Sequence, residues 1–482
     1  MRTSLDQAKQ VFAHHGGAPL GATHSRLRRL PISDVLGRVS RMSLRTIPLA
    51  AGALPVLGHL LPLLRDPFGF ITGLPGQGDL VRIKVGPATV VVVCDPELTR
   101  QVHRDDRAFD KGGPISEWNR RLLGDGLFTC PHHIHRRQRR QLQPVFHRDL
   151  VSGYLDKAAA RIAELTGSWR DGQILDVSAE MRKLTSSVVV STLFSDSLPP
   201  DTVRQALRDG DVFLNTPVQL LTLSEFKLPV LNVRERKQAQ QRLQQVSTDI
   251  VRRHRAGGRD RHDLLSTLIA DADDQGALSS PEEQISNNVL TFFLAGAETT
   301  SLTLAWALHH LTQAPEVAER LRAEVDEVLA DHPVGPADLE RLPLARRVIS
   351  ETLRLRPPGW VASRSLTADT KLGEHLLPAG TNVVVSPYLI HRRHDLYPDP
   401  ERFDPDRWLH TRATATASYI PFGNGARKCI ADNFALGEAA LALAGITRQW
   451  RLDPVPGARV RPVPAGTLRT KGLLLHATAR EH

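Results

Sequence analysis

A glycine-rich segment near the carboxyl end, PFGNGARKCIADNFAL at residues 421–436, constrains this chain more than any other segment. Gly423 and Gly425 permit a sharp backbone turn and a close approach to another group, because glycine has no Cβ atom. Cys429 follows within four residues and directly precedes a helical pattern. The segment therefore predicts a tight loop that presents one cysteine side chain beside the start of a helix.

The sulfur of Cys429 is a candidate metal ligand. Arg427 and Lys428 stand beside it in the sequence, and backbone N–H groups of the turn can point at it, so we expect the thiolate to be favoured over the thiol. A structural zinc site or an iron–sulfur cluster needs several protein ligands, and the other cysteines, Cys94 and Cys130, form no CxxC pair with it. One thiolate suffices when a macrocycle supplies the other ligands, as in haem. A small buried cysteine in a turn, the alternative, would not need two glycines and an arginine at this spacing.

Composition limits the class of protein further. With 482 residues and 41% hydrophobic residues, the chain can bury a large core. Its net charge is +10, but the basic residues are scattered and aromatic residues make up only 5%, so we expect no nucleic-acid partner and consider contact with an acidic protein instead. Three cysteines argue against a disulfide framework and favour the reducing cytoplasm.

Hydrophobic patterns predict one large, mainly helical unit with minor β-structure near its ends. Residues 79–94 alternate and then run apolar around a Gly-Pro pair, which is typical of a β-hairpin. Helical patterns dominate from about residue 150 to residue 355, and residues 371–387 return to short strands. No repeat and no low-complexity linker is evident, so residues 49–482 are predicted to form a single domain.

Residues 1–48 are predicted to be a poorly ordered N-terminal extension. Arg38, Arg41 and Arg45 share one helical face there, opposite apolar residues, so weak contact with a membrane surface stays open. We predict no transmembrane helix, because prolines and glycines break the early apolar segment IPLAAGALPVLGHLLPLL. The acidic run DADDQ at residues 271–275 resembles a metal-binding cluster, but a solvated loop between two helices is the preferred interpretation.

Two helical segments contain polar side chains with a chemical or structural purpose. In LTFFLAGAETTSLTLAWAL, residues 290–308, Glu298 and Thr299 lie in the middle of an apolar helix. Burial of a carboxylate is unfavourable unless the group is used, and an acid beside a hydroxyl at a helix irregularity suits proton delivery. Glu351 and Arg354 share one helix face at a spacing of three residues.

Together these segments resemble the cytochrome P450 family. In that family Phe-Gly-x-Gly-x-Arg-x-Cys carries the axial thiolate, and the matching positions are Phe422, Gly423, Gly425, Arg427 and Cys429. Ala431 stands where the family usually has glycine. AGAETT resembles the oxygen-activation motif, and the triad that stabilises the cysteine side of the haem is matched by Glu351, Arg354 and Arg402. The resemblance implies a mainly α fold with minor β, in which a large helical subdomain and a small β-rich subdomain enclose a buried haem.

The resemblance also implies how haem b is held. Cys429 would be the metal ligand. In PHHIHRRQRRQ, residues 131–141, Arg139 takes the arginine position and His135 the tryptophan position of a Trp-x-x-x-Arg helix that donates hydrogen bonds to a haem propionate. Histidine can donate from a ring nitrogen as indole does. The two propionates would also be bound by Lys111, Arg364 and Arg427.

As a member of this family, the chain would be a haem-thiolate monooxygenase that activates O2, with Thr299 and Glu298 delivering protons. Electrons from NADPH or NADH would arrive through a separate ferredoxin and ferredoxin reductase, since no flavin domain follows the cysteine. A basic face that docks an acidic ferredoxin would be formed by Arg136, Arg137, Arg140 and Lys428. We expect a cytoplasmic monomer.

The substrate is predicted to be a small apolar molecule, because the candidate pocket positions carry no charged group. These positions are Ile115, Trp118, Leu122, Phe292, Phe293, Ala295, Trp360, Val361 and Leu468. The segment from FDKGG to the basic helix is similar to P450s of actinomycete terpene pathways, which implies a sesquiterpene or another terpenoid. A fatty acid or a polyketide is the alternative substrate, and a non-catalytic haem-binding sensor is the alternative class of protein.

Overall fold

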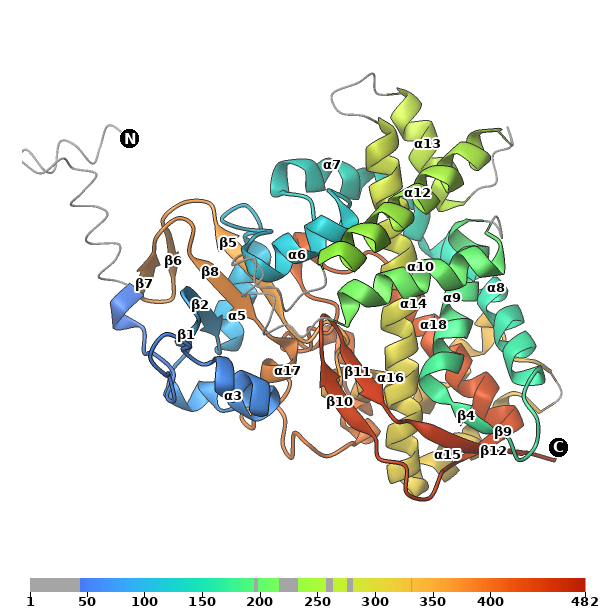
Figure 1. Ribbon diagram of the computed structural model, residues 1–482. Helices are drawn as coiled ribbons and strands as arrows, with labels where there is room; N and C mark the ends of the chain where they lie inside the picture. The colour runs from blue at the N-terminus through green and yellow to red at the C-terminus, as the bar shows by residue number, and fades with distance from the viewer. Residues whose placement is uncertain are drawn as a thin grey trace, which may run out of the picture.

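The computed structural model describes residues 44–194, 198–215, 233–256, 263–274, 281–330 and 332–481. Helices gather on one side of the molecule around the long α14 (Pro281–Gln313), and a β-sheet lies on the other side (Figure 1). This arrangement confirms the mainly α class with minor β. Most of the N-terminal extension, including Arg38 and Arg41, lies outside the described residues.

Helix α14 forms the axis of the helical part. Its side chains are buried on almost every face, as expected for a helix that is apolar all round. Gly296 permits a close helix contact, because a Cβ atom there would lie 2.7 Å from Val189 of α9 (Val177–Leu193). By length and composition Glu282–Gln313 could also cross a membrane, but 83% of its apolar window is buried inside the protein, so α14 is a core helix.

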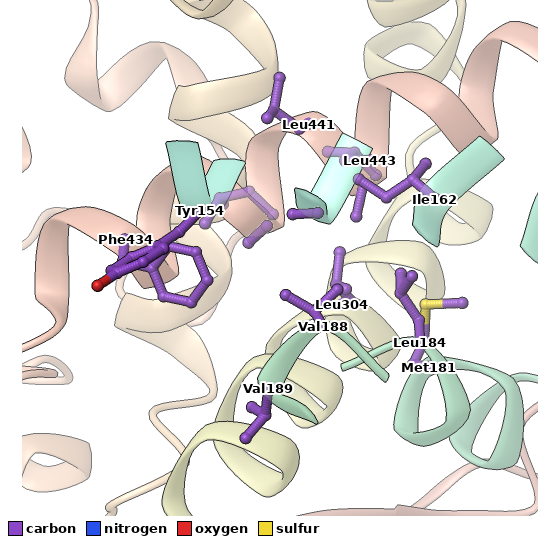
Figure 2. Close-up of a cluster of buried hydrophobic side chains, with 14 of the residues drawn as sticks. Tyr154, Ile162, Met181, Leu184, Val188, Val189, Leu304, Phe434, Leu441 and Leu443 are labelled. Atoms are coloured by element: carbon purple, nitrogen blue, oxygen red, sulfur yellow. The ribbon is translucent and has the colours of Figure 1, made fainter. Parts of the chain in front are cut away.

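The helix that follows the cysteine loop, α18 (Asp432–Gln449), is anchored by a continuous apolar core (Figure 2). Phe434 meets the ring of Tyr154 edge-on at 6.1 Å, which joins α18 to α8 (Arg148–Gly167). Further buried side chains of α8, α9, α14 and α18 belong to the same core: Ile162, Met181, Leu184, Val188, Leu304, Leu441 and Leu443. Each such side chain stabilises a fold by about 1.5–3 kcal/mol, so this core fixes the start of α18, and with it the cysteine loop, relative to α14.

The main sheet brings together segments that are distant in the sequence. Its strands, in spatial order, are β1 (Leu80–Val85), β2 (Ala88–Val93), β8 (Asn382–Val385), β5 (Ala362–Leu366) and β3 (Phe109–Asp110). β1 and β2 form the predicted hairpin, with Gly86 at a φ of 59° in its turn. Asp110 pairs with Ser365 in the β3–β5 register, so Lys111, the next residue along the chain, lies beside the strand that carries Arg364.

The remaining elements complete the two parts. The other helices are α3 (Leu60–Arg65), α4 (Pro67–Thr72), α5 (Pro96–Arg104), α6 (Gly113–Leu123), α7 (His132–Leu142), α10 (Pro200–Leu214), α12 (Val233–Ala256), α13 (Leu264–Asp274), α15 (Pro315–Val328), α16 (Pro343–Leu355) and α17 (Pro387–Ile390). The small sheets are β4 (Ile174–Asp176) with β12 (Leu474–Ala479) and β9 (Trp450–Pro454), β10 (Arg461–Pro464) with β11 (Leu468–Lys471), and β6 (Thr370–Leu372) with β7 (His375–Leu377).

The acidic run that begins at residue 271 is not the predicted loop. Its first four residues, 271–274, form the end of α13. Within the described ranges, no group of three or more His, Cys, Asp or Glu side chains could hold a metal ion.

Candidate active site

The cysteine loop rests directly on the end of helix α5. Gly423 and Gly425 have φ values of 70° and 66°, in the left-handed region that favours glycine. A Cβ atom on Gly425 would overlap the carbonyl oxygen of His103, so only glycine permits this contact. The N–H of Cys429 donates to the carbonyl oxygen of Phe422 at 2.9 Å and closes the loop. The glycines therefore permit the sharp turn and the close approach that the sequence predicted.

Ala431, which replaces the family's usual glycine, fits without backbone strain. Its φ is −105°, which any residue can adopt. Its N–H donates a hydrogen bond to the sulfur of Cys429. The departure from the family pattern therefore leaves the loop intact.

The sulfur of Cys429 is less acidic than the sequence suggested. Burial raises the pKa of the Cys429 thiol, and Asp432 adds to this effect, whereas the Ala431 N–H, Arg139 and Lys428 oppose it. Desolvation of the charged sulfur thus opposes the expected preference of the loop for the thiolate. A coordinated metal ion deprotonates a thiol outright, so the thiolate would form together with the metal bond.

Arg427 was expected beside the sulfur, but its guanidinium group points to the other side of the loop. Its Nη2 lies 2.8 Å from Oδ1 of Asp110, and its Nε lies 3.3 Å from Oδ2 of Asp106. Asp110 also accepts a hydrogen bond of 2.9 Å from the backbone N–H of His132, the first residue of α7. Arg427 thus joins the cysteine loop to β3 and α7.

Three cations gather near this point. Burial, and then the charge of Arg427, lower the pKa of Arg364 to about 10. The pKa of Lys111 is lowered by burial and by the charges of Arg364 and Arg427. Like charges repel one another strongly in a desolvated site, so the cluster of Lys111, Arg364 and Arg427 favours a ligand with negative charge beyond what Asp106 and Asp110 provide.

Two buried histidines adjoin the same cluster. His135 of α7 is 2% exposed, and its Nδ1 has no hydrogen-bond partner among the described residues. Burial and the charge of Arg427 lower the pKa of His135 to about 3, so the ring is neutral and keeps one N–H donor at neutral pH. His103 of α5 is in the same state, with an unpartnered Nδ1 and a pKa lowered to about 3 by burial and by Arg364. Sequence reasoning missed His103, which belongs to no motif.

These groups fit a haem. An unpartnered buried imidazole and a repelling cluster of cations suit the two propionates, and the half-buried Cys429 suits the iron. Arg139 is placed differently from the others: its Nη1 donates to the carbonyl oxygen of Lys428 at 2.5 Å and its Nε to Gln143 at 2.8 Å, so it binds α7 to the cysteine loop.

The oxygen-activation motif lies on a regular stretch of α14. The helix is continuous, so the predicted irregularity at Glu298 and Thr299 is absent from this described helix. The Thr299 hydroxyl donates to the carbonyl oxygen of Ala295 at 2.9 Å, and both residues lie on an accessible face. The side chain of Glu298 is buried on another face, so the acid and the hydroxyl have different surroundings.

Glu298 is held by side chains that no sequence motif indicated. Its Oε1 forms an ion pair with Nη2 of Arg469 at 2.6 Å and accepts a hydrogen bond from the Thr467 hydroxyl at 3.0 Å. Nη2 of Arg182 lies 3.5 Å from its Oε2. Asp211 of α10 contacts both arginines, at 2.9 Å and 2.6 Å. The network therefore joins α14, α9 and α10 to the β11 region.

The structural triad needs one correction. Glu351 and Arg354 form a fully buried ion pair at 2.8 Å, as their spacing indicated. Arg402, the predicted third member, has an exposed side chain and contributes only its carbonyl oxygen, 3.1 Å from Arg354. Arg407 instead reaches Glu351 at 3.5 Å, and the indole of Trp408 donates to Glu351 at 3.0 Å. Two arginines stand five residues apart in PERFDPDRW, and the sequence alone favoured the wrong one.

Most predicted pocket residues belong to the core. The buried ones are Trp118, Leu122, Phe292, Phe293, Trp360 and Leu468, whereas Ile115, Ala295 and Val361 keep accessible surface. Trp360 is fully buried and donates from its indole to the carbonyl oxygen of Ala465 at 2.9 Å. Phe292 stacks on Phe146 at 5.6 Å. The pocket prediction is therefore wrong for the fully buried Trp360 and Leu468.

A basic hollow lies beside α7 and the cysteine loop. It has a volume of about 900 Å³, and its lining includes Arg136, Arg139, Arg140 and Arg148, together with the buried His135 and with Gly425 of the loop. Arg136, Arg137 and Arg140 are exposed, as a docking face requires. Lys428 is paired with Asp432 at 2.5 Å, so its charge is partly neutralised.

The fold and this site define a haem-thiolate protein, and comparison with known proteins agrees. A family model described as Cytochrome P450 matches residues 48–480. Cyclooctatin synthase of Streptomyces melanosporofaciens is 40% identical over 435 residues, which cover 87% of this chain and 94% of the relative. Pentalenene oxygenase of Streptomyces avermitilis is 40% identical over 437 residues, which cover 89% of this chain and 97% of the relative.

Two further comparisons point the same way. Cyclooctat-9-en-7-ol 5-monooxygenase of Streptomyces melanosporofaciens is 41% identical over 416 residues, which cover 85% of this chain and 90% of the relative. The crystal structure of the haem domain of cytochrome P450DA superimposes with a TM-score of 0.78 at 27% identity, and the match covers 90% of this chain and 98% of that one. This chain belongs to the cytochrome P450 family. It is a haem-dependent monooxygenase that uses O2, with electrons that originate from NAD(P)H.

Proposed function

We propose that the chain oxidises a terpenoid hydrocarbon or terpenoid alcohol, most simply by hydroxylation. The observation that carries this proposal is the similarity, at 40–41% identity and over nearly the full length, to relatives named for oxidising cyclooctat-9-en-7-ol and pentalenene. The accessible face of α14 supports it, because Ala295 and Thr299 present no charge there. A carboxylate substrate such as a fatty acid would need a cation that these positions do not supply.

Each side chain of the site has a proposed task. Haem, when bound, supplies the iron that activates O2, and a cysteine ligand donates electron density that favours O–O cleavage. Cys429 is proposed as that ligand. Lys111, His135, Arg364 and Arg427 are proposed to bind the propionates, with His103 as a neighbour and Arg139 as the residue that holds the cysteine loop.

The Thr299 hydroxyl is proposed to orient a water molecule on the accessible face of α14. Glu298 is proposed to supply protons to that water. A carboxylate that is paired with Arg469 and accepts a hydrogen bond from Thr467 must first leave these partners, so proton delivery requires the network around Glu298 to rearrange.

Electrons are proposed to arrive from a separate, acidic ferredoxin and its reductase. The basic hollow beside the cysteine loop, with Arg136, Arg140 and Arg148 on its lining, offers complementary charge close to the proposed iron ligand. We propose a single domain over residues 49–482 that acts as a monomer in the cytoplasm.

Reconstitution tests the proposed activity. The haem-loaded protein is incubated with ferredoxin, reductase, NADPH and a panel of terpenoids, fatty acids and polyketides, and products are identified by mass spectrometry. Oxygenated products from terpenoids alone are expected, together with a substrate-induced shift of the haem spectrum. Turnover of fatty acids alone would contradict the substrate class. Turnover with peroxide alone would contradict the role of the ferredoxin, and haem binding without any turnover would favour a sensor.

A further inference from the structure

Exposed aliphatic side chains are concentrated in one short stretch of the surface. Six of the twelve large hydrophobic side chains that are exposed in the described part of the chain lie between residues 49 and 64: Leu49, Leu54, Val56, Leu57, Leu61 and Leu64. They belong to α3 and to the loop before it, which lie at the sheet side of the molecule (Figure 1). Single exposed hydrophobic side chains need no explanation, but a cluster of this kind marks an interaction surface.

The turn at the tip of this cluster is fixed against β1. Leu54 and Gly58 exchange two backbone hydrogen bonds of 2.8 Å and 2.9 Å, so residues 54–58 form a closed turn. A Cβ atom on Gly58 would overlap the backbone of Lys84, which shows how tightly the turn sits on β1. His59, fully buried, fixes the base through a 2.9 Å hydrogen bond to the carbonyl oxygen of Ala50.

Val56, at the tip, combines an exposed aliphatic side chain with a strained backbone conformation. Its side chain is 89% exposed, and its φ of 63° lies in the left-handed region, where a β-branched residue is strained. Asparagine or glycine would relieve the strain and also suit water. The turn therefore retains a strained valine in the one position where its aliphatic side chain projects furthest.

Basic residues outnumber acidic ones in the segments next to the aliphatic cluster. Arg45, Arg65 and Lys84 are exposed there, together with one acidic residue, Asp66. The sequence before the cluster is also basic, with Arg26, Arg28, Arg29, Arg38 and Arg41, but these residues lie outside the described part of the chain. A second copy of this chain would bring the like charges of Arg45, Arg65 and Lys84 together, whereas anionic lipid head groups would neutralise them.

The inner side of the same elements continues into the core. Leu63 and Ile71 of α3 and α4 are buried in one cluster with Trp360 and Leu468, and Phe68 lies 5.6 Å from the Trp360 ring. Val361, which keeps accessible surface, packs against this cluster. Apolar side chains are therefore continuous from α3 and α4 to Trp360 and Leu468 in the core.

We infer that residues 54–64 form a docking site for an anionic membrane surface, with Val56 and Leu57 inserted at the level of the acyl chains and the basic residues at the head groups. The aliphatic tip and basic rim match the two contributions that hold peripheral proteins at a bilayer, buried apolar area and attraction to anionic lipid. Such docking would give the protein access to an apolar substrate dissolved in the membrane, and this consequence rests on the proposed function. The docking itself does not depend on the proposed function.

Co-sedimentation with sucrose-loaded vesicles tests this inference without substrate or redox partners. The full-length, haem-loaded protein is expected to bind vesicles that contain phosphatidylglycerol, and to bind pure phosphatidylcholine more weakly. Val56→Asn with Leu57→Glu should lower the partition coefficient at least about tenfold, with an unchanged haem spectrum. Ile174→Glu is the matched control, because Ile174 is exposed on β4 at the opposite side of the molecule (Figure 1). This variant should bind the vesicles as strongly as the unmodified protein does.

Three outcomes would overturn the inference. The first is that the unmodified protein stays in the supernatant with anionic vesicles. The second is that the double variant still binds them fully. The third is that the unmodified protein does not bind vesicles but forms a dimer in light scattering, and that the double variant is a monomer. The cluster would then be an interface between two copies of the chain. Because none of these readouts involves oxidation, they are independent of the substrate test.

Discussion

At the scale of single residues, the arginine that pairs with the buried carboxylate of Glu351 is expected to contribute to the stability of the fold. Arg407→Ala removes a partner of this fully buried group and is expected to lower the apparent free energy of unfolding by about 1–3 kcal/mol. Arg402→Ala is the control and should change it by less than about 0.5 kcal/mol, because the exposed side chain is not used. Urea unfolding of both haem-loaded variants, followed by tryptophan fluorescence, measures the difference. A greater loss for Arg402→Ala would contradict the assignment.

Glu438 of α18 gives a prediction that depends on pH. Burial raises the pKa of Glu438 to about 8, which a hydrogen bond with Thr300 opposes in part, and its Oε1 has no partner among the described residues. Because the folded pKa lies above the unfolded value of 4.5, this group's stabilising contribution is complete below pH 4.5 and is lost as the pH rises to about 8.

Glu438→Gln should remove that dependence. Its unfolding free energy, relative to that of the unmodified protein, should increase by up to about 1.4 kcal/mol per pH unit between pH 5 and pH 8. Glu327→Gln, at an exposed position of α15, should leave the pH profile unchanged. A Glu438→Gln profile parallel to that of the unmodified protein would show that Glu438 does not remain protonated in the folded state.

At the scale of elements, Glu298 connects α14 to β11 and α9, and Asp211 extends the connection to α10. Glu298→Gln keeps the shape of the side chain and its hydrogen bond with Thr467, but it replaces the carboxylate with an amide, which does not act as a general acid or base. Turnover should fall about 100-fold, with a larger solvent isotope effect, while haem content and the substrate-induced spectral shift stay unchanged. Glu282→Gln, exposed in the first turn of the same helix, is the control. Unchanged turnover would exclude Glu298 from proton delivery.

The elements also show what sequence could and could not predict. The hairpin of β1 and β2 and the buried helix α14 followed from local periodicity, and the cysteine loop from the need for glycine at two positions. The partners of Glu298 could not be predicted, because Thr467 lies 169 residues away, in the turn before β11, and nothing in the local sequence marks a turn residue that contacts a distant helix. The pocket prediction was wrong for a related reason, because the sequence does not show which apolar side chains are buried by distant segments. Aromatic residues such as Trp360 were expected to line a cavity but are fully buried in the core.

At the scale of the whole molecule, the cation cluster lies where the sheet part meets the helical part. Lys111 directly follows β3, Arg364 lies on β5 and Arg427 lies in the cysteine loop, and the neutral His135 of α7 adjoins them. The family resemblance indicated these four residues, but not the aspartates Asp106 and Asp110 that pair with Arg427. Two different surfaces are proposed to meet partners: residues 54–64 meet a membrane, and the basic hollow beside α7 meets a ferredoxin.

The central claim is that Cys429 ligates a haem iron as a thiolate. The most direct test is the absorption spectrum of the reduced, CO-bound protein, compared with that of Cys429→Ser. The unmodified protein should show the thiolate-specific CO band, and the variant should lose it, because a serine oxygen cannot donate electron density as a thiolate does. A thiolate band that survives in Cys429→Ser would show that another residue binds the iron, and the proposed site would be wrong.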